Sequence, residues 1–105
     1  MTEVLHWDEK RDGALTEAAL RRKLESLGYR STTYVYSPGT SFPPHAHDID
    51  KLDAVLSGTF RIVLEGRVLD LGPGDAAYVP RGARHSAEVI GDERVVSLDG
   101  VRVTR

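Results

Sequence analysis

The spacing of apolar residues changes once along this chain, near residue 28. Before that point Leu20, Leu24 and Leu27 recur at intervals of three and four residues, which is the spacing of one helical face. Thr16 is suited to cap the first turn of such a helix, and Gly28 is suited to its left-handed end. We therefore predict an amphipathic helix over residues 16–27. Its apolar stripe should pack on the outside or mouth of the remaining domain, or on a partner subunit.

From residue 29 onward apolar and polar positions alternate with a period of two, and Gly and Pro punctuate the chain at short intervals. This pattern predicts strands over residues 30–37, 42–50, 52–57, 59–65, 68–71, 76–79, 84–90 and 94–103. Strands this short and evenly spaced favour an all-β barrel or sandwich. A chain of 105 residues makes one ordinary domain. We expect an N-terminal segment with its helix over residues 1–29, followed by the barrel over residues 30–105.

Composition excludes several classes of function. Lys and Arg number 14 against 16 Asp and Glu, and no basic block appears, so nucleic acid and anionic membranes have no electrostatic attraction to this chain. There is no cysteine, which excludes disulfides, thiolate nucleophiles and thiolate metal ligands. No apolar run approaches the roughly 20 residues of a membrane span, and the first residues lack the apolar segment of a signal peptide. We therefore expect a cytoplasmic protein.

Three histidines carry the main chemical signal. His45 and His47 are two positions apart, so in an extended strand both imidazoles lie on one face. A metal ion usually needs at least three protein ligands, and His85, which follows a Pro-Arg-Gly turn, is the natural third. Neutral imidazole suits iron, zinc, copper and nickel, and we expect a divalent ion of one of these metals or of manganese. The sequence therefore predicts a three-histidine metal site, and the alternative is a site that has lost its metal.

The two stretches that contain these histidines resemble the two motifs of small single-domain cupins. The first motif, G-x5-H-x-H-x3-4-E-x6-G, and the second, G-x5-P-x-G-x2-H-x3-N, are matched by Gly39, His45, His47 and Gly58 and by Gly74, Pro80, Gly82 and His85. The resemblance covers residues 30–105. It implies an antiparallel, jelly-roll-like barrel of six to eight strands in which the two motifs face each other. It also implies a homodimer.

Two positions depart from the motifs. Lys51 occupies the position of the family's ligand glutamate, and Val89 that of its asparagine. Strand alternation places Lys51 and Asp53 on the face of His47. A protonated lysine is repelled by a metal cation, so Lys51 either anchors a substrate carboxylate, acts as a base with a lowered pKa, or forms an ion pair with Asp53. Asp50 or Asp53 as a fourth metal ligand is a further alternative.

Two classes of function are consistent with this site, and both involve a small-molecule ligand. The resemblance extends to three-histidine cupins that are thiol and diketone dioxygenases, which implies a metal-dependent dioxygenase of a small anionic substrate. In that case Lys51 would be catalytic and would steady developing negative charge. Tyr36, Phe60 and Val89, together with Lys51 and Asp53, would then line the substrate pocket. The alternative is a non-catalytic cupin that binds a small molecule, with or without a metal.

Overall fold

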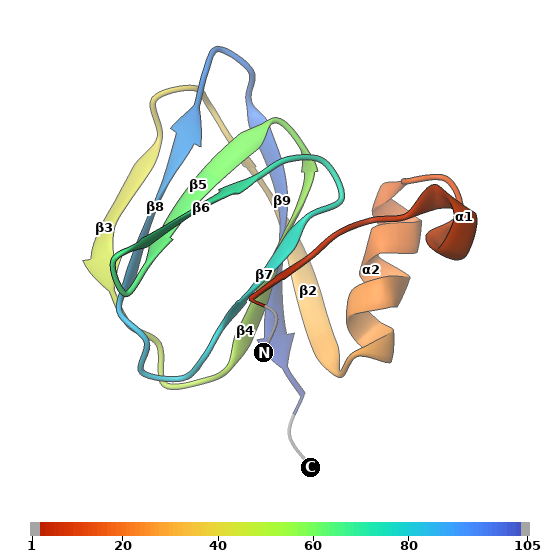
Figure 1. The fold of residues 1–105 in the computed structure, drawn as a ribbon, viewed down its shortest axis with the longest axis horizontal. Helices are drawn as coiled ribbons and strands as arrows, with labels where there is room; N and C mark the ends of the chain where they lie inside the picture. Colours follow the sequence, from red (N-terminus) through yellow and green to blue (C-terminus); the bar gives the residue numbers. More distant parts are fainter. Residues whose placement is uncertain (1–2, 104–105) are drawn as a thin grey trace.

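Two antiparallel sheets form a sandwich with two short helices on one side (Figure 1). The computed structural model describes residues 3–103. One sheet has the strand order β1-β7-β4-β9-β2, and the other has the order β3-β8-β5-β6. The helices are α1 (Glu9–Asp12) and α2 (Glu17–Ser26), and the strands are β1 (Val4–Leu5), β2 (Tyr29–Tyr36), β3 (Ser41–His45), β4 (Lys51–Ser57), β5 (Thr59–Leu64), β6 (Arg67–Leu71), β7 (Ala76–Val79), β8 (His85–Ile90) and β9 (Val95–Arg102).

The predicted helix is confirmed, and it covers its own sheet. The Thr16 hydroxyl accepts a hydrogen bond from the backbone N–H of Ala19 and caps the first turn of α2. Leu20 and Leu24 are each 1% exposed and pack in one apolar cluster with Leu52. Helix α2 therefore lies against β2 and β4, on the outer face of the five-stranded sheet (Figure 1).

The predicted strands are confirmed except that one is shorter than expected. We expected a strand over residues 42–50, but β3 ends at His45. His45 pairs with His85, the first residue of β8, so no strand lies opposite the residues that follow; within β3, Pro43 and Pro44 lack the N–H that a ladder needs, and the register shifts between Phe42 and His45. Strand β1 and helix α1 had no sequence signal, since two residues and one turn are too short for a periodic pattern.

A second apolar cluster fills the space between the two sheets. Its buried members include Val55, Phe60, Ile62, Leu64, Leu71, Val79, Val89 and Val95. Gly58 joins β4 to β5 with a φ of 82°, and a Cβ there would lie 2.4 Å from the carbonyl oxygen of Arg94. The motif glycine is therefore required by both backbone conformation and space.

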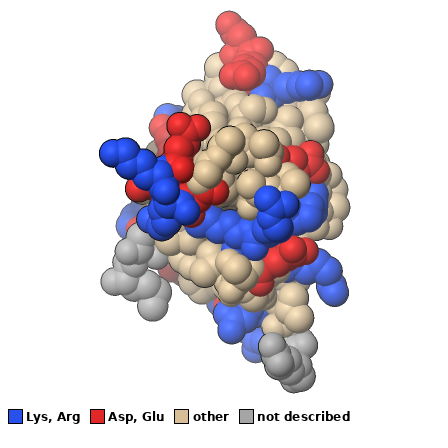
Figure 2. Space-filling model, turned by 90° about the vertical axis from the view of Figure 1, so that its right-hand side faces the viewer, with Lys and Arg blue, Asp and Glu red and all other residues tan. Residues whose placement is uncertain are grey.

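Charges of both signs are mixed on the face that carries the helices (Figure 2). Arg21 pairs with Glu17 at 2.9 Å, and Lys23 pairs with Asp12 at 3.0 Å. This mixing agrees with the absence of a basic block in the sequence. Among residues 3–103, no helix is both long and apolar enough to cross a membrane.

Candidate metal centre and its cavity

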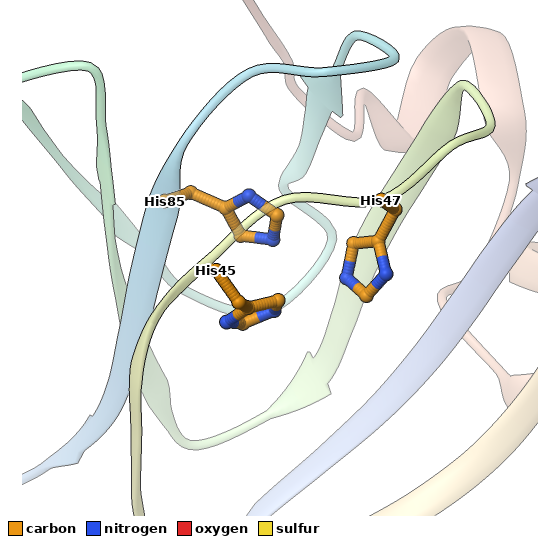
Figure 3. Close-up of side chains that lie close together, drawn as sticks. All are labelled: His45, His47 and His85. Atoms are coloured by element: carbon orange, nitrogen blue, oxygen red, sulfur yellow. The ribbon is translucent and has the colours of Figure 1, made fainter.

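The three histidines come together where β3 meets β8. His45 is the last residue of β3 and pairs in register with His85, the first residue of β8, while His47 follows in the loop after β3. The ring centroid of His45 lies 4.7 Å from that of His47 and 4.3 Å from that of His85. One nitrogen from each ring lies within 4.8 Å of the others (Figure 3). The predicted histidine cluster is therefore formed and could hold a metal ion.

Backbone carbonyls orient two of the three imidazoles. Nδ1 of His45 lies 2.7 Å from the carbonyl oxygen of Pro43, and Nδ1 of His85 lies 2.9 Å from that of Ala83. A carbonyl oxygen only accepts hydrogen bonds, so in both rings Nδ1 carries the proton. The lone pair of Nε2 is then available to a metal ion, which is the usual arrangement of a histidine ligand.

The surroundings favour the neutral form of His47 and His85. Burial lowers the pKa of His47, and the charges of Lys51 and of the neighbouring histidines lower it further. Burial lowers the pKa of His85 too, with smaller contributions from His45 and Lys51. Neutral imidazole is the form that binds metals. Proximity, tautomer and protonation state together show that these residues fit a divalent metal ion.

A cavity of about 170 Å³ lies beside the histidines. Four of the residues predicted for a substrate pocket line it, namely Tyr36, Lys51, Asp53 and Phe60. The residues that complete its wall with the three histidines are Phe42, Ile62, Ala87, Ser97 and Asp99. Val89 packs in the core between the sheets at 6% exposure and is not among the lining residues.

The structure places Asp50 away from the histidine cluster. Its carboxylate accepts a hydrogen bond of 2.8 Å from the backbone N–H of Arg81. The alternative of Asp50 as a fourth metal ligand is therefore not supported, because its carboxylate joins two loops and belongs neither to the cavity wall nor to the histidine cluster.

Lys51 lies between two carboxylates. Its Nζ is 2.6 Å from Oδ1 of Asp99 and 3.5 Å from Oδ1 of Asp53. Burial by itself lowers the pKa of Lys51, but the two carboxylates outweigh burial and the net direction is upward. The surroundings thus favour a charged ammonium over a neutral amine base. The ion pair with Asp53 is present as one half of a larger cluster.

Asp99 is the charged residue of the cavity that sequence reasoning missed. It lies directly opposite Asp53 where β4 pairs with β9. Burial raises the pKa of Asp53 to about 7, with Lys51 acting against the rise and Asp99 adding to it. Only the register between two strands that are far apart in the chain reveals the pair, and no local pattern encodes that register.

Comparison with known proteins defines the family. The model of the cupin domain family matches residues 32–101, about two thirds of the chain. The chain belongs to the cupin family. The cupin is similar to KdgF from a Halomonas species, with 26% identity, a TM-score of 0.63, and 73% of this chain and 71% of KdgF covered.

A further similarity concerns an enzyme with Mn(II) centres. Oxalate decarboxylase from Bacillus subtilis is 28% identical with a TM-score of 0.63, and the match covers 71% of the cupin and 22% of the enzyme. The three-histidine cluster of the cupin is consistent with a metal site of this kind.

One curated relative is a regulatory protein. The transcriptional activator RhaS from Mannheimia succiniciproducens is 39% identical over 56 residues, which are 53% of the cupin. The match covers only 21% of RhaS, so about half of the cupin aligns with about a fifth of that protein.

Proposed function

We propose that the cupin binds a divalent metal ion through His45, His47 and His85 and acts as a dioxygenase-type oxidoreductase on a small anionic substrate. The observation that carries this proposal is the geometry of the three imidazoles. Their nitrogens lie within 4.8 Å of one another, and backbone carbonyls hold two of the rings with Nε2 available. The similarity to an enzyme with Mn(II) centres supports a metal at this position.

The residues of the cavity suit such a ligand. A divalent ion held by three histidines would supply Lewis acidity and open coordination positions and, in the case of iron, one-electron chemistry toward dioxygen. Three neutral imidazoles cancel none of the charge of the ion, which favours an anionic ligand group beside it. Tyr36 stacks on Phe60, and Phe42 packs edge-on against both rings, so the three aromatic side chains give the cavity an apolar wall.

Metal content measured by elemental mass spectrometry tests the first half of the proposal. We expect near-stoichiometric metal in protein purified without an affinity tag, or after reconstitution with Mn²⁺ or Fe²⁺. His47→Ala should lower metal affinity more than about tenfold, because even residues that only support a ligand alter affinity by that factor. His6→Ala is the matched control, since His6 is exposed and pairs with Asp75 outside the cavity.

Dioxygen uptake tests the second half. The iron-loaded cupin should consume dioxygen with a small acid or diketone, and the His47→Ala variant should not. A protein that takes up no metal after reconstitution would contradict both halves of the proposal. If the metal-loaded protein consumes no dioxygen with any of these substrates, the proposed dioxygenase activity is contradicted and only the proposed metal centre stands.

A second candidate function is ligand binding without turnover. Two observations favour it: Lys51 occupies the position of the family's ligand glutamate, and part of the chain matches a transcriptional activator. In that case the cavity would bind a small molecule that is recovered unchanged after incubation with metal-loaded protein. Analysis of the bound molecule by mass spectrometry before and after incubation separates the two functions.

A further inference from the structure

The cavity beside the histidines has one polar wall and one apolar wall. The five-stranded sheet contributes side chains with charges or a hydroxyl from β4 and β9, namely Lys51, Asp53, Ser97 and Asp99. The four-stranded sheet contributes apolar side chains, namely Phe42, Phe60, Ile62 and Ala87. His45 and His85 belong to this second sheet. A ligand held at the histidines would therefore have the apolar wall directly beside it.

The strand register places the apolar wall next to the histidine row. His45 pairs with His85 across β3 and β8, and Phe42 pairs with Ala87 on the same two strands. Ile62 of β5 pairs with Ala87 from the other side. Residues two positions apart on a strand share a face and lie about 7 Å from each other. A ligand with its anionic end at the histidines and a short apolar end along β8 would thus cover both rows.

Ala87 leaves room for such an apolar end. The inward-facing residues of β8 are His85, Ala87 and Val89, because alternate residues of a strand share a face. Val89 packs into the core between the sheets, and His85 belongs to the histidine cluster. The short side chain of Ala87 therefore lies at the cavity between two larger neighbours.

Three aromatic rings determine which apolar group fits best. The centroid of Tyr36 lies 5.5 Å from that of Phe60, with the two rings stacked, and 5.1 Å from that of Phe42, which packs edge-on. Aromatic groups prefer such stacked and edge-on neighbours. The cavity volume of about 170 Å³ also suits one ring, since an apolar protein cavity of about 150 Å³ binds benzene.

The polar wall does not require a second charge on the ligand. Nζ of Lys51 lies 2.6 Å from Oδ1 of Asp99 and 3.5 Å from Oδ1 of Asp53, so these charged groups are paired with one another. A second carboxylate on the ligand would be repelled by the two aspartates. A ligand with one anionic group and an uncharged remainder therefore agrees with both walls.

We infer that Phe42, Phe60, Ile62 and Ala87 form a subsite for a single aromatic ring, and that the substrate is a small aromatic monocarboxylic acid. Its carboxylate faces the three histidines and its ring lies over Ala87. This inference rests on the proposed function, because the metal would hold the carboxylate.

Three carboxylates with the same anionic group test the inference: benzoate, cyclohexanecarboxylate and acetate. We would titrate each into zinc-loaded protein by calorimetry, because zinc supports binding without redox chemistry. Burial of the ring should make benzoate bind about ten- to one-hundredfold tighter than acetate. Contacts with the aromatic wall should make benzoate bind about two- to tenfold tighter than cyclohexanecarboxylate, which has a saturated ring.

A variant that fills the subsite locates the ring. Ala87→Leu should reduce the ratio of benzoate to acetate affinity to within about threefold, while acetate affinity and zinc uptake are unchanged. Ala18→Leu is the matched control, since Ala18 is exposed on α2 and is not among the residues that line the cavity. If Ala87→Leu does not fold, Phe42→Leu replaces it and should remove the advantage of benzoate over cyclohexanecarboxylate.

Several results would overturn the subsite. These are a benzoate affinity no higher than that of acetate or of cyclohexanecarboxylate, or an unchanged ratio of benzoate to acetate affinity in folded Ala87→Leu. Failure of the metal centre gives a different result, because the protein would then take up no zinc. In that event the same titrations on metal-free protein decide: a persisting preference for benzoate supports the subsite alone, and equal or undetectable binding removes it.

Discussion

The two faces of β4 have opposite chemistry. Leu52 and Ala54 are fully buried and face the layer covered by α2, while Lys51 and Asp53 face the cavity with the histidines. Neighbouring residues of one strand therefore serve the fold and the candidate site in turn, because successive side chains point to opposite sides of a sheet. Each face can be changed without directly touching the other.

The two faces also contribute to stability with opposite signs. Burial of a leucine side chain stabilises the fold by about 1.5–3 kcal/mol. On the cavity face two carboxylates lie directly opposite each other with one ammonium between them, and like charges in this position are destabilising. The helix-covered face therefore stabilises the fold, whereas the pair of aspartates on the cavity face does not. The following predictions test this division.

The largest expected effect is on the helix-covered face. Leu24→Ala removes a side chain that is 1% exposed and should lower the free energy of unfolding by about 3–4 kcal/mol, since it leaves a cavity between α2 and the sheet. Denaturant unfolding measures the loss. Metal uptake per folded molecule should stay at the wild-type value.

Leu27→Ala is the control for this variant. Leu27 ends the same helix but is 38% exposed, so the loss should be below about 1 kcal/mol. A loss of metal binding by folded Leu24→Ala would contradict the independence of the two faces.

The next effect comes from the cavity face. Lys51→Met leaves Asp53 and Asp99 without their cation and should cost about 2 kcal/mol at pH 8. This is less than the roughly 3–5 kcal/mol of a fully buried pair, because Asp53 can take up a proton. Metal affinity should rise, since the ammonium no longer repels the ion. Unfolding and metal titration of the same preparation provide both values, and a variant more stable than wild type would show that the lysine does not stabilise the cluster.

Asp53 on the cavity face should also make the stability of the protein depend on pH. Burial raises the pKa of Asp53 from 3.8 to about 7, so the folded protein holds this proton more tightly than the unfolded chain. The resulting stability is complete below about pH 4 and is lost as pH rises through 7. Relative to Asp53→Asn, metal-free wild-type protein should therefore lose stability between pH 4 and 8, at about 1.4 kcal/mol for each unit by which the pKa of Asp53 is raised.

Comparison with the variant removes the contribution of the histidines. The pKa values of His47 and His85 are lowered, so these groups make stability rise with pH in both proteins and largely cancel in the difference. A difference that is constant from pH 4 to 8 would show that Asp53 ionises in the folded protein as readily as in the unfolded chain.

Local patterns of sequence predicted the helix-covered face better than the cavity face. The four-residue spacing of Leu20 and Leu24 and the cap at Thr16 are local signals within a few residues of each other. The ends of the helix could therefore be predicted to within a residue or so. The H-x-H spacing and the motif around His85 likewise predicted the histidine cluster. Asp99 could not be predicted, because its position opposite Asp53 depends on the pairing of β4 with β9 across more than 40 residues. The alternation of β4 did predict that Lys51 and Asp53 share a face.

The smallest expected effect lies on neither face of β4 but on the outside of the other sheet. Arg61 and Asp70 pair at 2.7 Å across β5 and β6, with side chains 36% and 46% exposed. Asp70→Asn should change the free energy of unfolding by less than about 1 kcal/mol, because water already solvates both charges. The same aspartate-to-asparagine change in the cavity, at Asp53, should have a pH-dependent effect, whereas the effect at Asp70 should stay small from pH 6 to 8. If the free energy of unfolding depends on pH in the same way in the two variants, the carboxyl of Asp53 behaves in the cavity as a solvent-exposed carboxyl does.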